Sequence, residues 1–512
     1  MPSPRSQDYV IGGDVGSQGT KAVLVSLAGV VVGEAAAGYA IDYPQPLWAE
    51  QPVERWTNAL TLAVRRLLAS TGVDPNRVRG LGLATQVDGV VAVDPAGEPL
   101  RPAIIWMDRR AGPQCEAIRQ TVGDDAVFRL TGLNLDASHV AAKIRWLADN
   151  QPRIYEQAAH FLLPGSYIAF YLTGEMAVDY SNASSTMLLD VRAKSWSAEL
   201  CQQFGIEPER LAPVGAATTP LARLRPARAE ALGLSAETIV MIGCGDEHAA
   251  CLGAGVVQPG LAGDIAGTAE PVCAASPELA FDQTRLVETH CHAEPNLWLL
   301  ENPGFVSGGN YRWYRDNFSP LEVRAAAELG LSPYQLLDAE AAKTPPGAEG
   351  LLFLPCLMGA MTPTWNEAAR GVFFGFTLAH TRDHFARAIL EGSAYAVRDI
   401  TDRMQALGLA LKEMRVMGGG ARSRLWNQIK ADVTGIPVTA PETTETTALG
   451  AAMLALVGIG AFANLAEAGR QMVRLVERFE PQPAAQTIYA GLYDRYRQLY
   501  FSLLPVFEQT AV

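Results

Sequence analysis

Short apolar runs separated by glycine turns open the chain. Residues 9–14 are apolar and end in Gly-Asp, residues 21–27 follow a glycine turn, and residues 30–34 begin a third run. We therefore expect three strands joined by hairpin turns. Residues 53–69 then carry apolar side chains at helical spacing, which predicts an amphipathic helix. The side chains expected to face the core are Trp56, Leu60, Ala63 and Leu67.

The same order of elements begins again near the middle of the chain. Residues 239–246 read as a buried strand ending in Gly-x-Gly-Asp, and residues 262–268 as a strand that runs into a Gly-Thr turn. A short strand at residues 415–417 precedes three glycines, after which a helix is expected. This repetition predicts an α/β protein of two domains, residues 1–245 and residues 246–512, each with a mixed sheet and helices on both faces.

The composition indicates a globular protein with more than one core. The chain has 512 residues, of which 49% are hydrophobic and 19% charged, which excludes intrinsic disorder. Lys plus Arg number 41 against 54 Asp plus Glu, and this net charge of −13 argues against a nucleic-acid partner.

Cysteine usage points to a reducing compartment. Seven cysteines without Cys-x-x-Cys spacing argue against a disulfide framework or a structural zinc site. The segment His290-Cys291-His292 could suggest metal ligands, but a strand whose side chains alternate between faces explains it better. We therefore expect reduced thiols in a cytoplasmic protein.

No segment has the pattern of a membrane or export signal. The first eight residues lack an apolar run, so we expect no signal peptide. Residues 446–466 carry no charge and are long enough to span a bilayer, but three glycines and an Asn favour a buried helix and turn. No membrane partner is expected.

Three glycine-containing turns have the composition of a phosphate or nucleotide site. Residues 14–21 place a carboxylate at a strand end before a Gly/Ser/Thr turn, a pattern different from both the Walker A loop and the dinucleotide fingerprint. Glycines let backbone N–H groups approach phosphate oxygens, and the carboxylate of Asp14 can hold Mg²⁺ through water. Residues 267–268 form a second such turn. Residues 418–423 form a third, between a strand and a helix N-terminus.

Polar side chains near the strand ends can bind and activate a substrate that carries hydroxyl groups. Asp246, at the tip of a buried strand, could orient and deprotonate an attacking hydroxyl, whereas the ordinary role of an Asp there is a helix N-cap. Nearby His248 is expected to be packed rather than catalytic. Four further side chains have groups suited to sugar binding. Asp88 and Asp108 provide carboxylates, Gln86 an amide and Trp106 an indole face.

Taken together, these residues resemble the FGGY carbohydrate kinases, and most closely their xylulokinase-like members. The resemblance runs from Tyr9 to about Leu504 and is strongest over residues 353–376 and 384–392. The N-terminal signature is looser. Its matching positions are Ser138, Lys143, Trp146, Leu147 and Asn150, while Val140 stands where Pro, Ser or Thr is usual.

The resemblance implies two ribonuclease-H-like domains of the actin/hexokinase ATPase superfamily with a cleft between them, and ATP and Mg²⁺ as cofactors. It implies that Asp246 is the catalytic base and that Asp14 lies near Mg²⁺ and the reacting hydroxyl. It assigns substrate contacts to Gln86, Asp88, Trp106, Asp108 and Glu247. It assigns ATP contacts to Gly16, Ser17, Gly19, Thr20, Lys21, Gly267, Thr268, Gly309, Gly419, Gly420 and Arg424.

Departures from the family pattern bear on the acceptor. Xylulokinases usually show Gln-Met-His-Gly where this chain has Gln86-Val87-Asp88-Gly89. A histidine that can donate a hydrogen bond is therefore replaced by Asp88, whose carboxylate accepts one. Glu247 stands where Asn is common, and residues 359–362 lack a usual Glu-Arg. The Arg-Glu pair of glycerol kinases is absent at residues 87–88. These changes favour a small neutral acceptor.

Several functions remain open from the sequence. A ketopentose such as D-xylulose is the first expected acceptor, and a pentitol, erythritol or another ketose could fill the same site. A non-catalytic nucleotide or sugar sensor and an actin- or chaperone-like ATPase are the alternatives of other classes. Family members are often dimeric, so a homodimer is a further expectation, although no segment identifies an interface.

Overall fold

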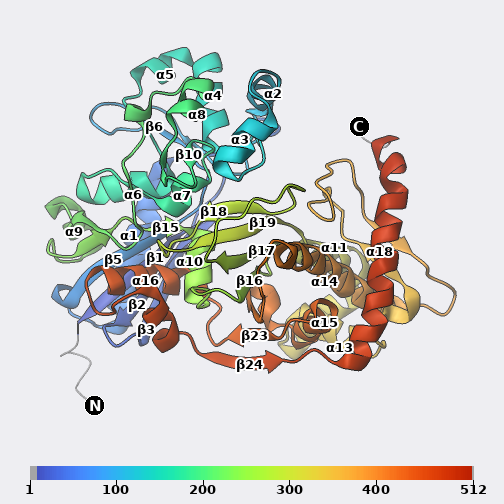
Figure 1. Cartoon of the computed structure of the whole chain (residues 1–512). Coiled ribbons are helices and arrows are strands. Elements are labelled where there is room, and N and C mark those ends of the chain that lie inside the picture. The colour runs from blue at the N-terminus through green and yellow to red at the C-terminus, as the bar shows by residue number, and fades with distance from the viewer. Residues whose placement is uncertain (1–7, 510–512) are drawn as a thin grey trace.

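The computed structural model describes residues 8–509 and builds them around two seven-stranded sheets (Figure 1). Residues 1–7, part of the segment from which no signal peptide is expected, lie outside the described residues. The first sheet has the order β13-β14-β5-β1-β2-β3, with β15 paired to β5. Its strands are β1 (Tyr9–Val15), β2 (Gly19–Ser26), β3 (Val31–Gly38), β5 (Val78–Thr85), β13 (Pro220–Arg223), β14 (Ile239–Met241) and β15 (Cys244–Gly245).

The second sheet has the order β18-β19-β17-β16-β22-β23-β24. Its strands are β16 (Leu261–Ile265), β17 (Ala269–Ser276), β18 (Glu288–Cys291), β19 (Trp298–Val306), β22 (Glu413–Met417), β23 (Val438–Pro441) and β24 (Leu475–Phe479). In both sheets an antiparallel hairpin is followed by a parallel neighbour: β1 pairs with β2 and β5, and β16 pairs with β17 and β22. The predicted repetition is confirmed, and with it the two-domain α/β class.

Helices and short ribbons complete both halves. The smaller ribbons are β4 (Glu50–Gln51) with β7 (Ala103–Ile104), β6 (Val91–Val93) with β8 (His160–Leu162), β9 (Val178–Asp179) with β12 (Val214–Gly215), β10 (Leu189–Asp190) with β11 (Ser195–Trp196), and β20 (Leu352–Leu354) with β21 (Val372–Phe374). The helices before residue 246 are α1 (Val53–Thr71), α2 (Gly112–Thr121), α3 (Asp124–Thr131), α4 (Val140–Asn150), α5 (Pro152–Gln157), α6 (Pro164–Thr173), α7 (Tyr180–Ser184), α8 (Ala198–Phe204) and α9 (Pro226–Leu232). The later helices are α10 (Asp246–Gly253), α11 (Gly308–Phe318), α12 (Pro320–Leu329), α13 (Pro333–Ala341), α14 (Arg382–Ala406), α15 (Arg424–Thr434), α16 (Thr446–Gly458), α17 (Leu465–Met472) and α18 (Pro483–Gln509).

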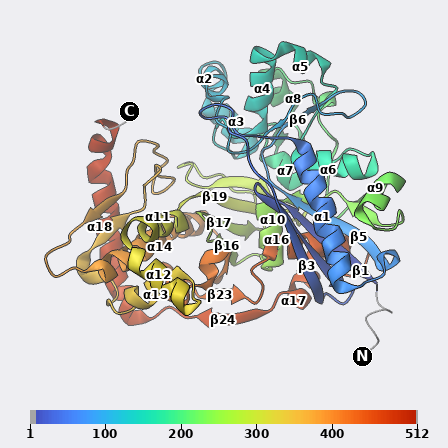
Figure 2. The ribbon, with the colours of Figure 1, turned by 180° about the vertical axis from the view of Figure 1, so that it is seen from behind.

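Helix α1 covers one face of the first sheet (Figure 2). Its apolar stripe is fully buried as expected, and Gly72 ends it in the left-handed conformation with φ 64°. A methyl group added at Gly13 of β1 would lie 3.3 Å from the Leu60 side chain of this helix. The amphipathic pattern of residues 53–69 therefore predicted both the helix and its buried face.

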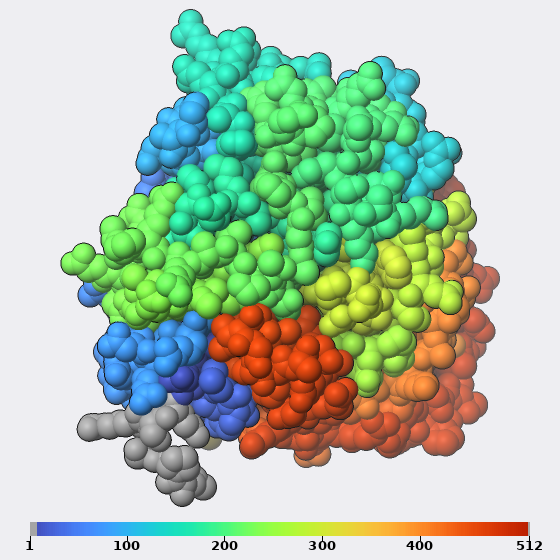
Figure 3. Space-filling model, turned by 60° about the vertical axis from the view of Figure 1, so that its left-hand side comes forward, coloured from blue at the N-terminus to red at the C-terminus, as the bar shows by residue number. Residues whose placement is uncertain are grey.

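The opposite face of the first sheet is covered by α16, which comes from near the end of the chain. A methyl group at Gly12 would lie 2.1 Å from the carbonyl oxygen of Ala448, and one at Gly82 only 1.9 Å from that of Ala451. Figure 3 shows an orange-red surface from a late part of the chain directly beside blue and green residues of the first half. The Ala/Gly-rich composition of residues 446–458 thus reflects helix-to-sheet packing with no room for larger side chains.

Helix α16 also packs against α10. A methyl group at Gly450 would lie 1.9 Å from the carbonyl oxygen of Ala249, and one at Gly253 only 1.8 Å from that of Thr446. The two helices therefore touch through their backbones, where the two halves of the protein meet. Among residues 8–509, no helix combines the length and apolarity needed to cross a membrane.

Candidate active site

Two carboxyl groups flank the end of one strand. In the parallel pairing of the first sheet, Ala84 of β5 is the register partner of Asp14 on one side and of Cys244 on the other. Asp246 follows β15 directly as the first residue of α10. Asp14 and Asp246 therefore lie on either flank of the carboxyl end of β5, the edge at which α/β sheets bind ligands.

The two carboxyl groups influence each other electrostatically. Burial and the charge of Asp246 raise the pKa of Asp14 to about 8, while the charge of Lys21 opposes the shift. Burial and the charge of Glu247 raise the pKa of Asp246 to about 7. A carboxyl group with a pKa near neutrality is suited to accept a proton from a substrate hydroxyl.

The first glycine turn is fixed by backbone and side-chain hydrogen bonds. Gly16 N–H donates to the carbonyl of Gly19 at 3.0 Å, and the Tyr39 hydroxyl donates to the carbonyl of Gly16 at 2.6 Å. The indole N–H of Trp106 donates to the Ser17 hydroxyl at 2.7 Å, although the Trp106 side chain remains 42% exposed. The indole is thus held beside the turn with an open face.

The two residues that follow this turn differ in their exposure to solvent. Thr20 is buried in β2, and the exposed Lys21 forms an ion pair with Glu445, immediately before α16. Thr444 accepts a hydrogen bond from Arg422 at 3.4 Å, so a short polar chain joins the first turn to the loop of the third.

A cavity of about 740 Å³ lies beside the second and third glycine turns. It is bounded by residues from the β16–β17 turn, from α11 and α13, and from the loop before α15. Its lining residues are Ala266, Gly267, Thr268, Gly308, Tyr311, Arg312, Arg315, Ser332, Tyr334, Gln335, Asp338, Gly419, Gly420, Arg422, Ser423 and Trp426. Gly309 lies beneath the second turn, where its N–H donates to the carbonyl of Thr268 at 3.0 Å. A cavity of this size, rimmed by glycine turns, can hold a nucleotide.

Comparisons with known proteins agree with this geometry. Residues 9–253 match the N-terminal domain, and residues 265–459 the C-terminal domain, of the FGGY family of carbohydrate kinases. The chain belongs to this family. It is therefore a carbohydrate kinase, an enzyme that transfers a phosphoryl group.

Relatives that match most of the length of this FGGY kinase are named after different acceptor substrates. The chain is 32% identical over 497 residues to xylulose kinase of Escherichia coli, covering 97% of this chain and 99% of the relative. It is 30% identical over 454 residues to gluconokinase of Bacillus subtilis, covering 88% of each. The crystal structure of xylulose kinase from Rhodospirillum rubrum has a TM-score of 0.89 at 31% identity, covering 98% of this chain and 100% of that one.

The structure brings most of the expected acceptor residues of the FGGY kinase to the end of β5. Gln86 follows β5 and donates from its buried amide to Gln51 at 3.0 Å. The charge of Asp88 raises the pKa of both Asp246 and Glu247, so Asp88 lies near the start of α10. Burial, together with the charge of Glu301 and a hydrogen bond to it, also holds the pKa of Glu247 well above its usual range.

Asp108 has a structural position and requires a correction. Its side chain is fully buried, one carboxylate oxygen accepts from Ala49 N–H at 2.6 Å, and both oxygens accept from Arg110 Nε at 2.9 Å. Arg110 in turn lies 3.6 Å over the ring of Trp48. Asp108 therefore stabilises its own loop and has no surface to offer a sugar.

Arg424 also lies elsewhere than expected. Its side chain is 78% exposed, and its guanidinium pairs with Glu477 of β24 at 2.5 Å, away from the cavity lining. The side chains of Tyr311, Arg312 and Tyr334 line the cavity instead, and Arg312 donates to the Thr268 hydroxyl at 2.5 Å. No local motif marks these residues, because α11 and α13 reach the site only through tertiary packing.

The histidine and cysteine segment lies in a strand, as expected. His290 and Cys291 are in β18, and His248 is buried in α10 with its ring 6.0 Å from that of His290. Within residues 8–509, no group of three or more His, Cys, Asp or Glu side chains is placed to hold a metal ion. All seven cysteines are buried and free.

Proposed function

We propose that this kinase transfers the γ-phosphoryl group of Mg²⁺-ATP to a hydroxyl group of a small neutral sugar, with a ketopentose such as D-xylulose as its first expected acceptor. The observation that carries the proposal is the placement of Asp14 and Asp246 on the two flanks of β5. In this reaction Asp246 takes the hydroxyl proton, the acceptor oxygen bonds to the γ-phosphorus, and ADP leaves.

The chain's own residues fit a magnesium nucleotide. Asp14 is a buried carboxyl group whose ionisation is opposed by the charge of Asp246, and a divalent cation would relieve that repulsion. Bound Mg²⁺ would neutralise charge on the phosphates. The first turn would line the phosphates on one side, and the Gly267-Thr268 turn and the Gly419-Gly420 loop would line them on the other.

The acceptor pocket favours neutral compounds. The charge of Asp88 raises the pKa of both Asp246 and Glu247, so acidic groups gather in this pocket and disfavour a sugar acid or a sugar phosphate. This argues against gluconate, the substrate that the name of one relative implies. A polyol is the second candidate, because Asp88 provides an acceptor for a hydroxyl group where xylulokinases usually have histidine.

A coupled ADP-release assay tests the proposal. Purified protein with Mg²⁺-ATP would be supplied with pentuloses, hexuloses, pentitols, erythritol, glycerol and gluconate, and kcat/KM compared. One neutral acceptor far above the rest would support the proposal and identify the substrate. No acceptor-stimulated ADP release from folded protein that still binds ATP would overturn it in favour of a sensor.

A further inference from the structure

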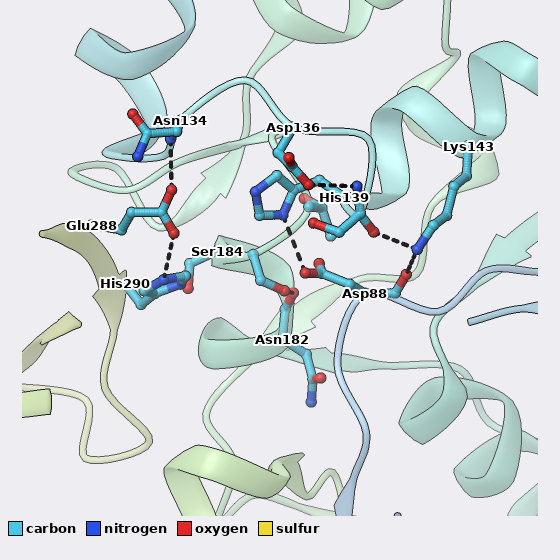
Figure 4. Close-up of polar contacts among 12 residues, drawn as sticks. Asp88, Asn134, Asp136, His139, Lys143, Asn182, Ser184, Glu288 and His290 are labelled. Atoms are coloured by element: carbon cyan, nitrogen blue, oxygen red, sulfur yellow. Dashed lines mark hydrogen bonds and ion pairs between the residues drawn. The ribbon is translucent and has the colours of Figure 1, made fainter. Parts of the chain in front are cut away.

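A histidine from another part of the chain lies against Asp88. His139 is the residue before α4, and its Nδ1 lies 3.2 Å from Oδ2 of Asp88, with both side chains buried. Figure 4 shows the imidazole and the carboxylate facing each other across two loops. The carboxylate that replaces the usual histidine of xylulokinases is therefore itself paired with a histidine.

One buried lysine holds both loops in place. The Nζ of Lys143 donates to the backbone carbonyl of Asp88 at 2.5 Å and to that of Ser138, next to His139 (Figure 4). Asp88 has a φ of 56°, a strained left-handed conformation for a residue other than glycine. Strain of this kind persists where surrounding contacts enforce it, and it is concentrated at functional sites.

His139 and Asp88 provide complementary hydrogen-bonding groups, a donor and an acceptor. Burial alone would lower the pKa of His139, but the charges of Asp88, Glu288 and Asp136 outweigh it and raise that pKa to about 9. The imidazole is then a cation with two N–H donors at neutral pH. Oδ1 of Asp88 is buried and has no hydrogen-bond partner within the described chain, so an acceptor oxygen remains available.

The second half of the protein supplies the facing wall. Oε1 of Glu288 in β18 accepts from the backbone N–H of Asn134 at 2.8 Å, and Oε2 lies 3.9 Å from Nε2 of His290. Figure 4 shows this pair across from Asp88 and His139. Nδ1 of His290 is also buried without a hydrogen-bond partner among residues 8–509. A buried polar atom without a partner needs an explanation, and a bound ligand or water that pairs with it is one such explanation.

We propose that Asp88 and His139, faced by Glu288 and His290, form the subsite that binds the acceptor's carbon chain beyond the reacting hydroxyl and sets acceptor specificity. This inference rests on the proposed kinase reaction, in which Asp246 engages the reacting hydroxyl. The imidazolium donates to a hydroxyl or carbonyl oxygen, and Oδ1 of Asp88 accepts from a neighbouring hydroxyl group. The subsite therefore takes a neutral vicinal diol or hydroxyketone.

Isosteric variants test the subsite. Asp88→Asn and His139→Gln should each raise the KM of the preferred acceptor about 10–100-fold, the effect of losing a hydrogen bond to a charged group, while the KM for ATP changes less than about twofold. The ratios of kcat/KM across the acceptor panel should also change. The exchange Asp88→His with His139→Asp should shift the preferred acceptor rather than abolish turnover.

Controls separate this subsite from a purely structural network. His384→Gln, on α14, removes a histidine in another part of the fold and should leave all acceptor ratios unchanged. If His139→Gln fails to fold, Asp88→Asn carries the test. Active variants that keep the wild-type acceptor ratios would overturn the subsite alone. A wild type without acceptor-dependent ADP release would overturn the proposed function, and the subsite with it.

Discussion

Glu247, next to the proposed base, shares a hydrogen bond with Glu301 of β19. Two ionised carboxylates cannot form such a bond, so the pair retains a proton that Glu247 donates. Burial raises the pKa of Glu301 to about 7, and burial raises that of Glu288 to about 7 although the charge of His139 opposes it. These carboxyl groups of the second half are therefore partly protonated near neutral pH.

This protonation makes stability depend on pH. Glu288 and Glu301 bind more protons in the folded protein than in the unfolded chain between about pH 4.5 and pH 7, because their folded pKa values lie above the unfolded ones. The free energy of unfolding of the ligand-free protein should therefore fall as the pH rises from 5 to 8. Urea unfolding at several pH values measures the slope. Glu301→Gln should reduce the slope, whereas Glu328→Gln, on the exposed face of α12, should leave it unchanged; a steeper slope in the first variant would contradict this assignment.

Asp246→Asn should lower kcat by about 10²–10⁴, the usual contribution of a general base. The wild-type kcat/KM for the acceptor should rise with pH through about 7, because Asp246 accepts a proton only when ionised. The variant should lose that limb of the profile and still bind ATP, which calorimetry can measure. The matched change Asp383→Asn, in the first turn of α14, should have no effect on kcat. Full activity in Asp246→Asn would exclude it as the base.

Lys430→Met should destabilise the protein by about 3–5 kcal/mol, the usual effect of removing one partner of a buried ion pair. Nζ of Lys430 lies 2.5 Å from Oδ2 of Asp264 and also pairs with Glu270, and all three side chains are fully buried. The two carboxyl groups stand on the strands that enter and leave the Gly267-Thr268 turn, so nucleotide affinity should fall as well. Lys412→Met, at an exposed position, provides the comparison. Equal unfolding midpoints in the two variants would show that the buried network adds no stability.

Gly450→Ala should destabilise the protein by at least about 1–3 kcal/mol, because the new methyl group would force α10 and α16 apart. Gly491→Ala is the matched change, since it also lies inside a helix but meets no atom within 4 Å. That variant should be as stable as the wild type or about 0.5–1 kcal/mol more stable. Thermal unfolding of both variants decides the point, and similar melting temperatures would refute close packing at this interface.

The sequence predicted the elements whose signals are local. Alternating apolar runs with glycine turns identified β1, β2 and β16, and helical spacing identified α1, because each pattern reflects burial of the element itself. The positions of Asp14 and Asp246 at strand ends were predicted for the same reason, whereas their catalytic roles stay predictions.

Contacts between distant segments had no such signal. Asp88 and His139 are 51 positions apart, and nothing in either segment indicates the other. The aromatic and basic side chains of α11 and α13 reach the cavity only through tertiary packing. Asp108 and Arg424 carry suitable chemistry, but Arg110 and Glu477 occupy their charged groups.

The position of α16 has a consequence for how the protein is made. The ribosome completes every strand of the first sheet long before it synthesises residues 446–458, which cover the Gly12 and Gly82 face of that sheet. Until then, that apolar face has no cover from its own chain. The first half therefore completes its packing only after residues 446–458 have been synthesised.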